Sequence, residues 1–146
     1  PGAGAALNLV GEGRGKSLVV AGRPMNAVFN FSACCGAVPK HSSNEHTMAN
    51  LGIDAHGLAN YSVLAPAITR SQFLSLHVSS ALIAGLSLGY GWCNRIELCE
   101  FHSNGMGVHI YNAGNNVDII DSIFEANVGP GMYLLRIIYI YICTAE

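Results

Sequence analysis

Three stretches of the chain, FLSLHV at residues 73–78, IELCEF at 96–101 and IIDSIF at 119–124, share one pattern of apolar residues. Each stretch begins 23 residues after the one before it, with apolar residues at its two ends and a small or apolar residue at its fourth position. A fixed period of this length is typical of repeat proteins in which each unit is one coil of a solenoid. The pattern therefore predicts columns of like residues stacked above one another.

Three inward columns with a step of 23 follow from this alignment: Phe73, Ile96 and Ile119; Leu76, Cys99 and Ser122; Val78, Phe101 and Phe124. A second strand of each unit supplies three further pairs, with the step drifting by one residue: Leu86 and Leu88, Val108 and Ile110, Met132 and Leu134. Counting back by 23 predicts an earlier unit that contains Ile53, Ala55 and Val63. Counting forward predicts the start of a later unit at Ile140 and Ile142.

The units alternate in a two-residue rhythm and are separated by Asn- and Gly-rich turns, which is the signature of short strands and not of helices. A strand of five or six residues spans roughly 17–20 Å, so one unit holds two or three strands and their turns. Asn104 and Asn127 lie 23 residues apart at the end of a strand, where they are expected to form an asparagine ladder. We therefore predict an all-β chain, a parallel β-helix of four to five coils; a β-sandwich of short strands is the alternative.

Residues 1–146 are expected to form a single domain, since a chain of this length buries one sizeable core. Two segments break the period: an inserted loop at about 32–47 and an irregular apolar end at 135–146. Cys34-Cys35 with His41 and His46 is a candidate thiol or metal group in that loop, against an ordinary loop. Without full caps the coil ends expose strand edges, so we expect a piece of a longer chain or self-association through those ends.

Composition argues against several partners. Seven basic and nine acidic residues occur without clustering, so no nucleic-acid partner is expected. The longest apolar stretch, 132–143, is interrupted by Arg136 and falls short of the roughly 20 residues of a membrane span, so none is expected. Gly11–Ser17 is rich in glycine but lacks the spacing of a phosphate-binding loop, and the five cysteines lack the paired spacing of a zinc site.

The segment LVGEGRGKS at residues 9–17 resembles the early-coil segment of pectate-lyase-like β-helix proteins, and residues 94–112 and 116–134 resemble their generic parallel β-helix repeat. The resemblance covers most of residues 7–134. It implies a right-handed β-helix, an outer face on which a polysaccharide lies across stacked strands, and an extracellular or cell-surface location. The motifs of polygalacturonases are absent, and Asp occurs only at 54, 118 and 121, fewer than the calcium site of a pectate lyase requires.

The outward positions between the inward columns form columns of their own: Asp54, His77, Glu100 and Ile123; His56, Ser79, His102 and Glu125. Neighbouring coils lie about 4.8 Å apart and alternate strand residues about 6.6 Å apart, so the acidic and histidine side chains are expected to converge on one patch. A histidine can exchange protons with a sugar while a carboxylate orients it or binds a cation. The candidate catalytic residues are Asp54, His56, His77, Glu100 and His102.

Two classes of function remain open on these residues. The first is a protein that binds or modifies an acidic polysaccharide on the outer face, as a lyase, an epimerase or a glycosidase would; the segment Gly52 to His56 is similar to the Gly-Phe-Asp-Pro-His segment of alginate epimerases at Gly52, Asp54 and His56. The second is a structural or adhesive module without catalysis, whose outward polar residues are only a solvated surface. No cofactor is expected; calcium is an alternative that the sequence does not support.

Overall fold

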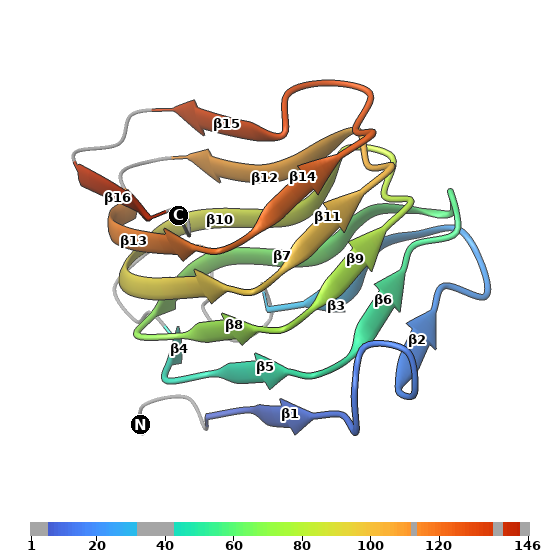
Figure 1. The fold of residues 1–146 in the computed structure, drawn as a ribbon, viewed down its shortest axis with the longest axis horizontal. Helices are drawn as coiled ribbons and strands as arrows, with labels where there is room; N and C mark the ends of the chain where they lie inside the picture. Colours follow the sequence, from blue (N-terminus) through green and yellow to red (C-terminus); the bar gives the residue numbers. More distant parts are fainter. Residues whose placement is uncertain (1–5, 32–42, 112–113, 136–138, 144–146) are drawn as a thin grey trace.

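The computed structural model describes residues 6–31, 43–111, 114–135 and 139–143, and these residues form strands and turns with no helix. The strands stack into a parallel β-solenoid of about four turns (Figure 1). In Figure 1 the strands in front run from left to right, the strands behind run back, and each coil lies above the one before it, which is a right-handed winding. The predicted fold class is confirmed.

Each coil contributes strands to three strips, and the pairing within each strip is parallel. The first strip contains β1 (Asn8–Val10), β5 (Thr47–Ala49), β8 (Gln72–Leu74), the end of β10 (Ala84–Glu97), β13 (Gly114–Ile120) and β16 (Tyr139–Cys143). The second strip contains β2 (Leu18–Val20), β6 (Gly52–Asp54), β9 (His77–Ser79), β11 (Glu100–His102) and β14 (Ile123–Glu125). The third contains β3 (Met25–Asn30), β7 (Ala59–Thr69), the start of β10, β12 (Met106–Tyr111) and β15 (Met132–Leu135), with β4 (Ser43–Asn44) beside the end of β7.

The period of 23 is the register of the central coils. Ile96 lies between Phe73 and Ile119 in the first strip, and Ile119 pairs with Ile142. Phe101 lies between Val78 and Phe124 in the second strip. The drifting column is also confirmed, because Leu86 pairs with Val108 and Val108 with Met132.

The backward extension of the period is wrong in the second strip. Ile53 pairs with Val78, 25 residues later, and not with Leu76. The cause is the turn after β6, which is two residues longer than the turn after β9. In the third strip, after this turn, Val63 pairs with Leu86 as predicted. Counting back across that turn therefore misplaces the positions of β6 by two residues.

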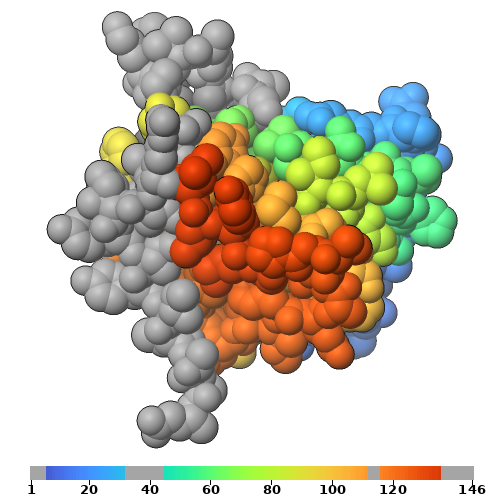
Figure 2. Space-filling model, turned by 90° about the horizontal axis from the view of Figure 1, so that it is seen from above, coloured from blue at the N-terminus to red at the C-terminus, as the bar shows by residue number. Residues whose placement is uncertain are grey.

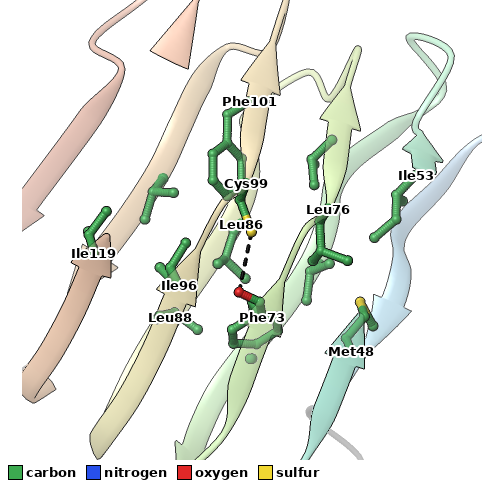
Figure 3. Packing of buried hydrophobic residues seen from close by; sticks show 14 of the residues in the cluster. Met48, Ile53, Phe73, Leu76, Leu86, Leu88, Ile96, Cys99, Phe101 and Ile119 are labelled. Atoms are coloured by element: carbon green, nitrogen blue, oxygen red, sulfur yellow. Dashed lines mark hydrogen bonds between the residues drawn. The ribbon is translucent and has the colours of Figure 1, made fainter. Parts of the chain in front are cut away.

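The predicted columns fill the interior of the central coils, and Phe73, Ile96 and Phe101 are all at most 1% exposed (Figure 3). In the last described coil the predicted inward residue Leu134 is exposed. The rings of Phe101 and Phe124 stack with centroids 5.4 Å apart and planes 9° apart. Opposite this stack the third strip places one glycine per coil, and a Cβ there would lie 2.7–3.0 Å from a phenylalanine atom: Gly85, Gly107 and Gly131. The glycine column therefore gives the phenylalanine stack its space.

The three corners of each coil are made by residues in the left-handed backbone region, with φ between 46° and 65°. They form three columns of four, none of them glycine: Glu45, Arg70, Cys93 and Asn116; Asn50, Ser75, Leu98 and Asp121; His56, Ser80, Ser103 and Ala126. This region costs an L-residue roughly 1–2 kcal/mol, so something must hold each corner in place.

Asparagine side chains from the following coil bind the backbone at corners in two of these three columns. The amide oxygen of Asn104 accepts a hydrogen bond from the Ala81 backbone at 3.0 Å, and its nitrogen donates to the Val78 carbonyl at 3.0 Å. Asn127 makes the same pair of bonds one coil later, to the Asn104 backbone and the Phe101 carbonyl, so the predicted asparagine ladder is confirmed. Asn94 repeats the arrangement at another corner, with the Ser71 backbone and the Ile68 carbonyl.

Two predicted segments fall partly outside the described residues. Residues 32–42 of the expected inserted loop, with Cys34, Cys35 and His41, are not described, and the following residues form β4 and the start of β5. Of the apolar end, β15 and β16 are described. No described helix is long and apolar enough to cross a membrane. Figure 2 looks down on the last described coil, in orange and red, with parts of the earlier coils, in green and blue, visible beside it.

Replacing Asn104 with alanine should lower the free energy of unfolding by about 2–4 kcal/mol, because a buried N–H and a buried carbonyl lose their partners together. Asn127→Ala removes the same two bonds at a partly exposed rung and should cost less, about 1–2 kcal/mol. Urea denaturation of both variants measures the difference. Equal losses would show that burial does not set the strength of the ladder.

His46 should make the fold sensitive to acid. Its side chain is buried, its Nδ1 accepts a hydrogen bond from the Leu7 backbone at 2.9 Å, and its ring lies 5.0 Å from Phe31. Burial lowers the pKa of His46 below the ordinary histidine value of about 6.5, as it does the pKa of His109. The unfolded chain therefore binds protons first, and stability present above about pH 6.5 is lost as the pH falls below that value.

We expect the free energy of unfolding to fall between pH 7.5 and pH 5, and His46→Gln to reduce that fall while lowering stability at both values. Denaturation curves of the wild type and the variant at the two pH values test this. An unchanged pH dependence in His46→Gln would remove His46 as its source.

Candidate functional site

The outward positions of the second strip carry the polar residues of interest, in two columns set by the pairing of β6, β9, β11 and β14. The columns are Gly52, His77, Glu100 and Ile123; and Asp54, Ser79, His102 and Glu125. The predicted columns were correct from β9 onward and wrong at β6, where Asp54 was expected beside His77 and His56 beside Ser79. The two additional residues in the turn after β6 are the reason, since they move Asp54 into the second column and His56 beyond the strand.

An open depression of about 400 Å³ lies over these strands. It is lined by Arg14, Gly15, Leu18, Asp54, His77, Ser79 and Glu100. Three of the five predicted site residues thus share one surface hollow. The remaining two, His56 and His102, lie beside it and not in its lining.

Glu100 is the centre of the charged groups in the depression. Its Oε2 lies 3.4 Å from Nδ1 of His77 and 3.7 Å from Nη1 of Arg14. The Glu100 side chain is 29% exposed and that of His77 37%, so water screens both contacts and each adds little to stability. The contacts matter for position, because one carboxylate oxygen holds both the imidazole and the guanidinium near it.

His102 and His56 extend the cluster at its edges. The ring of His102 stacks against that of His77, with centroids 6.4 Å apart, and its Nδ1 lies 2.9 Å from the hydroxyl oxygen of Ser103. The backbone N–H of His56 donates to Oδ1 of Asp54 at 2.8 Å, and its Nδ1 lies 3.9 Å from the other carboxylate oxygen. His56 occupies the corner after β6, with φ of 52°, and its side chain is 67% exposed.

Arg14 is the residue of the site that the sequence did not reveal. It belongs to the glycine-rich loop between β1 and β2, and this loop lies against the outside of β6 because Gly52 has no side chain there. A Cβ on Gly52 would lie 2.9 Å from the Arg14 carbonyl and 2.9 Å from Leu18. The sequence carries one signal of this arrangement, which is Gly52 itself. It occupies an outward position at which the next two coils have the large side chains of His77 and Glu100.

The arrangement supplies proton-exchanging groups and a cation, and no described group of three or more His, Cys, Asp or Glu side chains is placed to hold a metal ion. An imidazole oriented by a carboxylate can take up or release a proton, and a guanidinium pairs with carboxylates in a fork geometry. Cys99 belongs to the core and not to this chemistry. Its thiol donates to the Phe73 carbonyl at 3.3 Å (Figure 3), and burial raises its pKa to about 11.

No protein-family model, no curated protein and no solved structure matches the chain.

Substituting Gly52 with alanine should displace the loop that carries Arg14, because the new methyl group meets the Arg14 backbone. Hydrogen exchange at residues 11–17 should become faster, while exchange in β9 and β11 stays as in the wild type. Gly22→Ala is the matched control, since a Cβ there meets nothing within 4 Å. Unchanged exchange in Gly52→Ala would mean that the loop does not depend on the missing side chain.

Proposed function

We propose that the chain binds an acidic polysaccharide across the outer face of the second strip, at the depression centred on Arg14, His77 and Glu100. The observation that carries the proposal is an open hollow in which a guanidinium, an imidazole and two carboxylates lie together. Arg14 is the group for a uronate carboxylate, because a guanidinium binds a carboxylate through two parallel hydrogen bonds.

The shape of the face supports a linear ligand. The strands of the second strip stack about 4.8 Å apart, so outward side chains repeat along the stack at regular intervals. Beyond the depression, His102 and Glu125 continue the column of Asp54 and Ser79 with further polar groups. A chain of sugar units can therefore meet one set of polar side chains after another, as the resemblance to pectate-lyase-like proteins implies.

The pair His77 and Glu100 gives the same site a means of modifying its ligand. The imidazole Nδ1 lies 3.4 Å from the carboxylate, so Glu100 can stabilise the imidazolium that forms when His77 accepts a proton from a sugar. Binding requires only the cation and the hollow; modification requires this pair as well. Separate measurements of ligand binding and of ligand modification therefore distinguish a binding protein from an enzyme.

Binding is tested by calorimetry with polygalacturonate oligomers at low ionic strength and pH 5.5. Arg14→Ala should weaken the affinity by about tenfold, the loss of one charge-assisted contact. Arg70→Ala is the matched control, because Arg70 forms a similarly long pair, 3.9 Å to Glu45, at another corner. Equal affinities for the wild type and Arg14→Ala, or equal losses in both variants, would refute the site.

Modification is tested by incubating the wild type and His77→Ala with uronate polymers and following chain length and new double bonds. Turnover by the wild type that His77→Ala lacks would assign the proton transfer to His77. Turnover that survives in His77→Ala would remove His77 from the reaction. Binding without any turnover by the wild type would identify a binding module.

A further inference from the structure

Half of the histidines of the chain gather around one depression. Of six, three lie on or beside the second strip: His56, His77 and His102. Their positions are fixed by adjacent groups, since His77 contacts Glu100, His102 stacks on His77, and His56 contacts Asp54. The local charge of this face therefore depends on the protons that the three imidazoles hold.

The other charged groups around this face give it a net negative charge. The loop between β1 and β2 contributes Arg14 and Lys16 with Glu12, and the strands contribute Asp54, Glu100 and Glu125. Two positive and four negative charges give a net charge of −2 when the three imidazoles are neutral. Arg23 and Asp121, in the turns at the ends of these strands, cancel each other.

Three protons change that charge from −2 to +1. Histidine is the side chain that ordinarily gains its charge between about pH 8 and pH 5, whereas carboxylates as a class keep theirs down to about pH 5. A polyanion is repelled by the first state and attracted by the second. Protonation of all three imidazoles thus reverses the sign of the local charge and does not only change its size.

We propose that these imidazoles form a proton-controlled gate, so that the face captures a polyanionic sugar chain near pH 5 and releases it near pH 8. This inference rests on the proposed function and adds its regulation. Glu100 couples the protonation of His77 to the availability of Arg14 for the ligand. A protonated His77 satisfies the Glu100 carboxylate at 3.4 Å, which leaves Arg14, 3.7 Å from the same oxygen, free to bind a carboxylate of the ligand.

The stacked pair strengthens the gate. Two imidazolium rings 6.4 Å apart repel each other, and an anion placed between or above them relieves that repulsion. Acidic pH therefore raises the affinity for a polyanion through attraction to the ligand and through relief of repulsion in the free protein.

The test is calorimetric titration with polygalacturonate oligomers at pH 5, 6, 7 and 8 in about 50 mM salt, where screening between exposed charges is weak. We expect the affinity to fall by about tenfold or more from pH 5 to pH 8, in line with three charges lost from the face. The double variant His77→Gln, His102→Gln should bind with an affinity that changes by less than about threefold over that range.

His109→Gln is the matched control, because it removes one histidine from the outer face of β12 in the third strip and leaves the second strip intact. Its pH dependence should equal that of the wild type. A wild type that binds equally at pH 5 and pH 8, or a double variant that keeps the full pH dependence, overturns the gate and leaves the proposed function standing. Absence of binding at every pH overturns the proposed function itself.

Discussion

The whole structure depends on the in-register stacking of one coil on the next. Each coil makes its backbone hydrogen bonds to its neighbours, so a coil depends on the coils beside it, and side chains of the central coils have partners directly above and below them. Inside the tube this brings Phe73, Ile96 and Ile119 together; outside it brings His77 beside Glu100. The core and the candidate site are thus two faces of the same register.

Stacking also requires that each coil turn sharply at its corners. At each corner a residue in the left-handed backbone region turns the chain sharply enough to close the tube. Side chains from the next coil bind the corner backbone and offset the conformational free energy that this region costs. The asparagines do this from inside the tube, where no water competes for their amides. The polar residues of the interior therefore fix the register, while the apolar columns provide most of the driving force for burial.

The sequence predicts this architecture well where turns have constant length and poorly where they do not. Phe101 could be placed over Val78 because both sit a fixed distance after a corner of the same type. Asp54 could not be placed, because the turn after β6 is two residues longer than the turn after β9 and the 23-residue period does not predict this difference. The error leaves the inward residues inside, because a shift of two keeps the alternation of a strand, but it moves each outward residue to another column.

Arg14 illustrates a different limit. Its loop lies outside the repeat, so no column contains it, and its place is decided by the absence of a side chain at Gly52. That absence joins a segment near residue 14 to Glu100, two coils up the stack. A regular β-helix face presents only the residues of its own strands. Here a missing Cβ lets a loop add a permanent cation to such a face, beside the carboxylates and imidazoles that the strands themselves supply.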